Sequence, residues 1–318
     1  MKKSKLIRLI ILAIACAVSF TAFVACNDSG SGKGETLITD KVYIDSVNGN
    51  DTNSGVEQTK AWRTLGKLSE TEIPAGCTVY LNGEFKGTLS FKGSGKENAP
   101  ITVTSFDKNN PAKIDGDGNS NVIILDGQSH IAIVGFEITL TADSFSARNG
   151  IFVTGDTGIV EGISIIDCYI HDIKGTHLSQ EAAGNYWDSY YACAAIMFRY
   201  MQTKCDINNK FDKITVKNCK IENVYGCGIR FHDLGLDITD EYANAYFSNV
   251  LIEDTTIDTT SADGVILQNC YKPVVRRCKI FRVGVLEPEG STNFHCAVWG
   301  CAVESPLYEY NEVAYTKY

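Results

Sequence analysis

The chain has 318 residues, of which 44% are hydrophobic and 21% are charged, and its net charge is −9 at neutral pH. This balance excludes a disordered chain, which would contain fewer hydrophobic and more charged residues. The acidic charge argues against a nucleic acid partner, because phosphate recognition needs a basic face.

The N-terminus predicts an export signal over residues 1–25. Four basic residues come before position 9, and a nearly continuous apolar run covers residues 6–24. Such a segment is removed and is not part of the fold. The run ends at Ala25-Cys26, and a polar Gly/Ser-rich stretch follows it.

This arrangement resembles the bacterial lipoprotein processing site, although Phe23 stands where that family usually has Leu. The resemblance implies an exported protein that is lipid-anchored through Cys26 at the outer face of the cell membrane. Residues 26–40 would then be a flexible tether. A plain signal peptide or an uncleaved anchor is the alternative.

The next elements are short. A strand near residue 43, an Asn/Asp/Gly turn cluster and a short amphipathic helix within 61–68 fit the string from Tyr43 to Leu68. Residues 78–81, 88–91 and 101–104 alternate in hydrophobicity, which predicts three strands.

From residue 114 onward the chain repeats itself in two columns. Short strands end at one recurring position, occupied by Phe136, Cys168, Cys219, Thr255, Cys278 and Asn311. Between them a small residue precedes a β-branched one, in Gly150-Ile151, Ala195-Ile196, Gly228-Ile229, Gly264-Val265 and Ala297-Val298. Two columns that recur together predict a solenoid with loop insertions. A β-sandwich would give alternation and turns but not these columns.

The cysteines of the first column are expected to be stacked core thiols, because cysteine is among the residues most often fully buried. Disulfides are the alternative in an exported protein. A zinc site is not expected, because the chain has no paired C-x-x-C motif.

The motifs resemble those of exported right-handed parallel β-helix repeat proteins of the pectate-lyase-like class. The motifs that carry the resemblance are Gly49–Leu65, Gly93-Ser94-Gly95 with Pro100–Val103, Asp263–Cys270, and Ala297–Cys301 with Tyr310–Val313. The resemblance implies an all-β, right-handed parallel β-helix over residues 41–318 with a short N-terminal capping helix. Members usually continue beyond the last motif, so the C-terminal coils are expected to be missing. The fold carries lyases, hydrolases, epimerases and binding proteins, and so it does not fix an activity.

Strand alternation predicts where a site would lie. If the β-branched members of the second column point inward, the next residue of each strand points outward. Arg199, Arg230, His232, Gln268 and Trp299 would therefore share one outer sheet face. The insertions at 174–193, 233–248 and 284–296 would border it.

We expect this face to bind a polysaccharide. Aromatic rings stack on sugars, and arginine pairs with a uronate carboxylate. The predicted substrate-binding residues are Arg199, Gln268, Trp299 and Trp187, and the predicted catalytic residues are Asp233, Asp263, Arg230 and His232. Each has a simpler interpretation: His232 as a surface hydrogen-bonding group, the arginines as surface ion pairs, and Asp263 as a turn cap.

The leading hypothesis is a cell-surface carbohydrate-active enzyme, either a polysaccharide lyase or a glycoside hydrolase. A non-catalytic glycan-binding or structural protein is the alternative, and a uronan epimerase is a lower one. Carboxylates of the insertions could ligate Ca²⁺, although no metal site can be assigned. The protein is expected to be a monomer.

Overall fold

The computed structural model describes residues 38–144, 146–175, 192–201, 208–232, 246–286 and 295–316. All of them belong to one compact unit, Leu37–Tyr318. Cys26 lies outside the described residues. No helix in the described ranges is long and apolar enough to cross a membrane.

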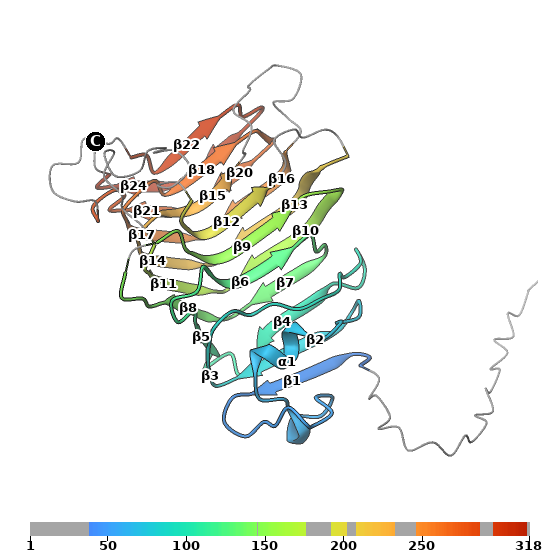
Figure 1. The fold of residues 1–318 in the computed structure, drawn as a ribbon. Coiled ribbons are helices and arrows are strands. Elements are labelled where there is room, and N and C mark those ends of the chain that lie inside the picture. The colour runs from blue at the N-terminus through green and yellow to red at the C-terminus, as the bar shows by residue number, and fades with distance from the viewer. Residues whose placement is uncertain are drawn as a thin grey trace, which may run out of the picture. The chain divides into compact units, whose positions relative to one another are not determined.

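The described chain winds through three parallel sheets, and one full coil contributes one strand to each (Figure 1). Sheet 1 is built from β1 (Lys41–Asp45), β2 (Thr78–Asn82), β4 (Ile101–Ser105), β7 (Ile131–Val134), β10 (Ile159–Ile166), β13 (Lys210–Lys217), β16 (Phe247–Glu253), β20 (Val274–Arg276) and β23 (Leu307–Glu309), with β19 (Cys270–Tyr271) beside β16. Sheet 2 is built from β3 (Glu84–Lys86), β5 (Lys113–Asp115), β8 (Glu137–Leu140), β11 (Tyr169–Ile173), β14 (Lys220–Val224), β17 (Thr256–Thr260), β21 (Lys279–Phe281) and β24 (Glu312–Ala314). Sheet 3 is built from β6 (Asn121–Asp126), β9 (Asn149–Gly155), β12 (Ala194–Tyr200), β15 (Cys227–His232), β18 (Val265–Gln268) and β22 (Val298–Cys301). The expected parallel β-helix is confirmed.

The first column of the repeat is the corner between sheets 1 and 2. The residue before each column position has a positive φ, from 52° at Asp254 to 71° at Gly135. Glycine adopts this left-handed conformation freely, and Asp and Asn tolerate it better than most residues. The turn directs the next side chain inward, so Cys168, Cys219 and Cys278 are buried. The nine described cysteines are free thiols.

The first residue of each pair in the second column is small because side chains of sheet 2 fill the space beside it. A Cβ added to Gly228 would lie 2.7 Å from Ile257 Cγ2 and 2.5 Å from the Gly264 carbonyl oxygen. A Cβ on Gly264 would lie 2.6 Å from Ile280 Cγ2. The β-branched residue that follows is completely buried at Ile151, Ile196, Ile229 and Val265.

Like side chains stack on like along the core. Phe198 lies on Phe231 with ring centroids 4.8 Å apart, and Phe211 lies on Phe247 with centroids 5.3 Å apart. Each coil therefore repeats the packing of its neighbour, which is how a solenoid builds a continuous core.

The N-terminal end carries the expected short helix. A 3₁₀ turn, η1 (Gln58–Lys60), leads to helix α1 (Leu65–Ser69), which buries Leu65 and Leu68. Thr64 Oγ1 caps the helix by accepting a hydrogen bond from the Lys67 amide. The prediction of a strand over 88–91 is wrong, because this segment forms only an isolated bridge between Leu89 and Ile123 at the end of sheet 3.

Candidate functional site

The outer face of sheet 3 brings together most of the predicted site residues. Strand pairing aligns one outward row along Ile124, Phe152, Met197, Arg230, Ile266 and Trp299. A second outward row contains the aligned residues Asp126, Thr154, Arg199 and His232, and on the following strands Gln268 and Cys301. Arg199, Arg230, His232, Gln268 and Trp299 thus stand on one face.

Three of these polar side chains are buried rather than exposed. Arg230 and His232 are each 4% exposed, and Gln268 is 6% exposed. An Arg230 guanidinium nitrogen donates a hydrogen bond to Gln268 Oε1 at 3.3 Å. The interpretation of His232 as a solvent-facing surface group is therefore wrong. Buried polar side chains are costly, so their presence on an outer sheet face indicates a built site.

His232 is held in its neutral form. Burial, together with the charges of Arg230 and Arg199, lowers the pKa of its imidazole to about 2. Arg199 lies directly across the strand pair from it. Within the described ranges, the buried His232 Nδ1 has no hydrogen-bond partner. A neutral imidazole beside two guanidiniums can accept a proton once an anion offsets the arginine charges.

An apolar cluster lies on the same face, separate from the core of the solenoid. It contains the buried residues Ala194, Met197, Cys227, Ala262 and Ile266. Phe152 and Trp299 are partly buried and pack against it. Trp299 stands on the outer face as expected, and Ile266 adjoins it in the row. No signal in the sequence pointed to this cluster, because an outward Met or Ile cannot be distinguished by sequence from any solvent-facing strand position.

Asp263 stands at the entry to β18 and is 4% exposed. Its Oδ1 accepts a hydrogen bond from the Cys296 amide of the next coil at 2.7 Å. Its Oδ2 lies 3.9 Å from Nδ1 of His295, whose side chain is also buried. Asp263 thus links two coils, and His295 is a neighbour that sequence reasoning missed. The signal was its place two residues before Ala297 of the second column.

Two predicted site residues, Trp187 and Asp233, lie outside the described residues. The other polar and aromatic residues of the insertions that were expected to border the face, Asp188, Tyr190, Tyr191, Asp237, Asp240, Glu287 and Glu289, lie outside them too. Among the described residues, no group of three or more His, Cys, Asp or Glu is placed to hold a metal ion.

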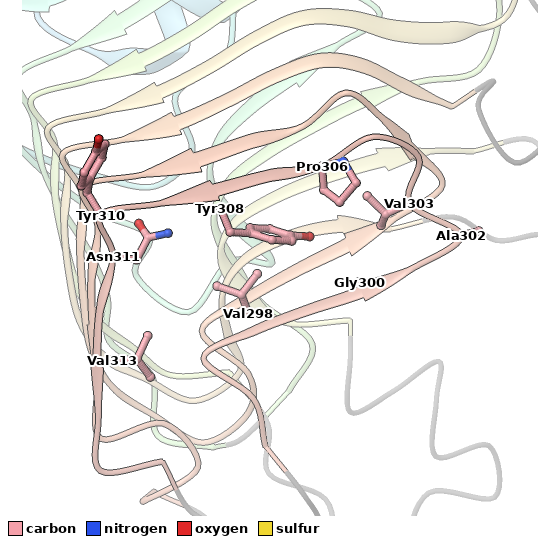
Figure 2. A pocket seen from close by; sticks show the side chains of 9 residues that line it. All are labelled: Val298, Gly300, Ala302, Val303, Pro306, Tyr308, Tyr310, Asn311 and Val313. Carbon is pink, nitrogen blue, oxygen red and sulfur yellow. The ribbon is translucent and has the colours of Figure 1, made fainter.

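A hollow of about 830 Å³ lies elsewhere, within the last coil (Figure 2). Val298, Tyr308 and Val313 line it with mainly apolar and phenolic groups. Its lining contains no carboxylate, imidazole or guanidinium, so it offers no acid–base chemistry comparable to the face of sheet 3.

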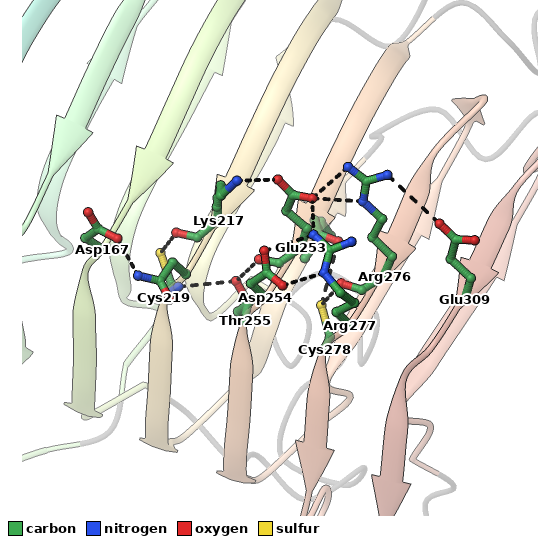
Figure 3. A network of polar contacts seen from close by, with 12 residues as sticks. Asp167, Lys217, Cys219, Glu253, Asp254, Thr255, Arg276, Arg277, Cys278 and Glu309 are labelled. Atoms are coloured by element: carbon green, nitrogen blue, oxygen red, sulfur yellow. Dashed lines mark hydrogen bonds and ion pairs between the residues drawn. The ribbon is translucent and has the colours of Figure 1, made fainter.

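A third polar cluster is an ion-pair ladder on sheet 1 at its corner with sheet 2 (Figure 3). Glu253 accepts hydrogen bonds from Lys217, Arg276 and Arg277, and Arg277 also pairs with Asp254. Every charge of this ladder has an opposite charge beside it. The arrangement is that of a stabilising network rather than of a reactive site.

No protein-family model matches the chain. The chain is 22% identical to lacto-N-biosidase of Bifidobacterium longum subsp. longum, over 95% of this chain and 24% of that protein. It is 35% identical to the uncharacterized protein YwoF of Bacillus subtilis, over 47% of this chain and 31% of that protein.

Solved structures with the same arrangement include the GH136 lacto-N-biosidase from Eubacterium ramulus, with a TM-score of 0.69 and 16% identity over 86% of this chain and 56% of that one. A rhamnogalacturonan lyase follows, with a TM-score of 0.59 and 17% identity over 88% of this chain and 69% of that one. The pectate lyase Pel9A has a TM-score of 0.53 and 16% identity over 81% of this chain and 57% of that one.

The chain spans 24% and 31% of the lengths of these two curated relatives and 56% of the lacto-N-biosidase structure. At these identities the structural likeness concerns the fold. The chain therefore shares the parallel β-helix fold of the lacto-N-biosidase, rhamnogalacturonan lyase and pectate lyase structures.

Proposed function

We propose that this chain is part of a carbohydrate-active enzyme that cleaves glycosidic bonds of a glycan bound on the outer face of sheet 3. The observation that carries the proposal is the buried polar cluster of Arg230, His232 and Gln268 beside Trp299 on that face. A glycan site needs donors and acceptors for hydroxyl groups together with an aromatic surface. The likeness to lacto-N-biosidase along 95% of the chain supports the same class of activity.

Glycoside hydrolysis is the leading reaction. It requires one carboxyl group to protonate the leaving oxygen and a second to act as nucleophile or to activate water. Asp263 is a buried carboxylate at this face, and Asp233 directly follows the buried His232 in the chain. We assign these two aspartates to that pair, with Arg199, Arg230 and Gln268 binding the sugar and Trp299 stacking on it.

Polysaccharide lysis is the second candidate, and the flanking of His232 by Arg199 and Arg230 favours it. β-Elimination requires neutralisation of a uronate carboxylate and a base that removes the proton beside it. A uronate bound to the two guanidiniums would offset the charges that depress the His232 pKa. The imidazole would then become a stronger base in the complex than in the free protein.

A single assay series separates these reactions. The protein is incubated with a lacto-N-bioside substrate and with a panel of neutral and uronate-containing polysaccharides. Release of new reducing ends without ultraviolet absorbance supports hydrolysis, whereas absorbance from an unsaturated sugar supports lysis. Parallel reactions with EDTA test whether the reaction depends on Ca²⁺, which carboxylates of the insertions could ligate. Retention of a glycan with neither signal contradicts both enzymatic proposals.

Matched variants locate the site. Trp299→Ala and Arg230→Gln are expected to reduce kcat/KM at least about tenfold, because each removes a direct contact with the sugar. Arg282→Gln is the control, because this arginine directly follows β21 of sheet 2, has an exposed side chain and pairs with Asp258. Equal activity in all three variants would move the site away from sheet 3.

We also propose that the protein is exported and lipid-anchored through Cys26, as its N-terminal sequence indicates. Metabolic labelling with a fatty acid tests this directly. Label on the wild-type protein and none on Cys26→Ser is the expected result. Unlabelled wild-type protein in the culture medium would contradict the anchor.

A further inference from the structure

The cysteine column contains one pair of thiols on consecutive coils. Cys168 and Cys219 occupy the same corner position in consecutive coils, and the Cys168 carbonyl accepts a hydrogen bond from the Lys220 amide. Each thiol is the leading cause of the shift in the other's pKa. Their Sγ atoms lie against carbonyl oxygens of the same strand end, Cys168 by Ile166 at 3.4 Å and Cys219 by Ile165 at 3.6 Å.

The stacking of coils sets the spacing of this pair. Neighbouring parallel strands lie about 4.8 Å apart, so stacked corner residues have Cα atoms within the 4.4–6.8 Å range of disulfides. Each side chain points inward from a left-handed turn, at Asp167 and at Asn218, and Asn218 Nδ2 donates a hydrogen bond to Asp167 Oδ1. The corner therefore turns both side chains toward the interior of the solenoid.

The next thiol of the column cannot join this pair. Thr255 occupies the intervening coil, and its hydroxyl lies 3.3 Å from the Cys219 amide nitrogen, so Cys278 stands one coil further away (Figure 3). Before Cys168 the column holds Phe136. Cys168 and Cys219 are thus the two column thiols that occupy consecutive coils within the described residues.

We propose that Cys168 and Cys219 form a disulfide that links two consecutive coils when the protein folds in an oxidising compartment. The Cys168 thiolate attacks one sulfur of a small or protein disulfide donor, such as oxidised glutathione, and releases one donor thiol. The Cys219 thiolate then attacks Cys168 Sγ and releases the second donor thiol. Two protein thiols become one disulfide, and the donor disulfide becomes two thiols.

In the folded corner the two neighbouring thiols shift each other's pKa in opposite directions, lowering the pKa of Cys168 and, together with burial, raising the pKa of Cys219. The thiolate is the reactive form in disulfide exchange. Both side chains are 2% exposed in the folded protein, so the exchange belongs to the folding chain, before the corner closes.

The crosslink would close the chain segment that contains β12. This strand carries Met197 and Arg199 of the sheet 3 face. A disulfide that constrains a long loop stabilises chiefly by reducing the freedom of the unfolded chain. The coil that bears Arg199 would then be crosslinked to the next coil of the solenoid.

The test is peptide mapping of the full chain after refolding with oxidised and reduced glutathione. Free thiols are alkylated under denaturing conditions, and the digest is compared before and after reduction. The expected result is a linked peptide pair containing Cys168 and Cys219, with two additional alkylated thiols after reduction. Recovery of both residues as singly alkylated peptides, or linkage of either to another cysteine, would overturn the proposal.

Matched variants confirm the assignment. Cys219→Ser should remove the linked pair and leave Cys168 alkylated, whereas Cys278→Ser should leave the pair intact. Reduction should lower the Tm of the oxidised wild type by at least about 5 °C and leave the Tm of Cys219→Ser unchanged. An equal response of the wild type and Cys219→Ser to reduction would contradict the crosslink, and the wild-type map alone decides the matter if the variant fails to fold.

Discussion

Glu253 provides a quantitative test of how the outer face of the solenoid is stabilised. Its side chain is 6% exposed, and its two oxygens accept hydrogen bonds from Lys217 at 2.7 Å, Arg276 at 2.8 Å and Arg277 at 2.7 Å. Strand register sets Lys217 and Arg276 on either side of Glu253. The perturbation is Glu253→Gln, which keeps the shape of the side chain and removes its charge.

The structure gives the size of the effect. The Lys217 hydrogen bond, aided by those from Arg276 and Arg277 and opposed by burial, lowers the pKa of Glu253 from 4.5 to about 2. A shift of this size corresponds to at most about 3 kcal/mol of stability. Lys217 and Arg277 are 45% and 44% exposed, so solvent screening reduces the expected loss in Glu253→Gln to about 1–2 kcal/mol.

The same interaction predicts a pH dependence with a definite sign. The folded-state pKa lies below the unfolded value, so the stabilisation is complete above pH 4.5 and is lost as the pH falls toward 2. The difference in unfolding free energy between wild type and Glu253→Gln should therefore shrink by about half between pH 7 and pH 3.

Urea unfolding followed by circular dichroism at both pH values measures this difference. Glu312→Gln is the matched control, because its carboxylate lies 3.9 Å from Lys279 and is 64% exposed, and its removal should cost less than about 0.5 kcal/mol. A Glu253→Gln protein as stable as the wild type at pH 7, or a loss that is the same at pH 3, would refute the reasoning.

Three further predictions concern the second column and the site. Gly228→Ala should destabilise the fold by about 1–3 kcal/mol in urea unfolding, because the new methyl group would lie 2.5 Å from the Gly264 carbonyl oxygen, whereas Gly66→Ala in α1 meets nothing closer than 3.6 Å and should cost no stability. The His232 imidazole should stay neutral between pH 8 and pH 4 in nitrogen NMR, since its folded-state pKa is about 2. Because the unfolded chain takes up this proton near pH 6.5, His232 should reduce stability as the pH falls below that value. A titration midpoint near 6.5 in the folded protein would contradict the burial of His232. Asp263→Asn keeps an oxygen that can accept the hydrogen bond from the Cys296 amide, so it should change Tm by only a few degrees. Because it removes the carboxylate, it should lower kcat at least about 100-fold, and an unchanged kcat would remove Asp263 from the catalytic pair.

Much of the architecture was predictable because a solenoid repeats its local interactions. The corner column needs a left-handed residue followed by a side chain that fits the interior, and Asp167-Cys168 and Asn218-Cys219 display that pattern directly. The second column needs a small residue where sheet 2 fills the interior, as at Gly264. Each requirement is met within a few neighbouring residues and recurs in every coil, so the sequence carries it many times over.

The site was predictable in position but not in environment. Strand alternation correctly aligned Arg230 with Met197, Ile266 and Trp299, because a strand has a fixed period of two. Alternation carries no information on what else packs against an outer face. The burial of Arg230 and His232, and the apolar cluster around Ile266, therefore came only from the tertiary structure.

By itself the sequence determined the class of fold, the inward and outward rows of each strand, and the corner that stacks Cys168 on Cys219. Only the tertiary structure decided which outward residues are withdrawn from water, that Asp263 lies beside His295, and that Glu253 is held by three cations. The physical reason is the range of the interactions. Periodicity and turn conformation act between near neighbours in the chain, whereas desolvation and ion pairing depend on residues that meet only after the coils have stacked.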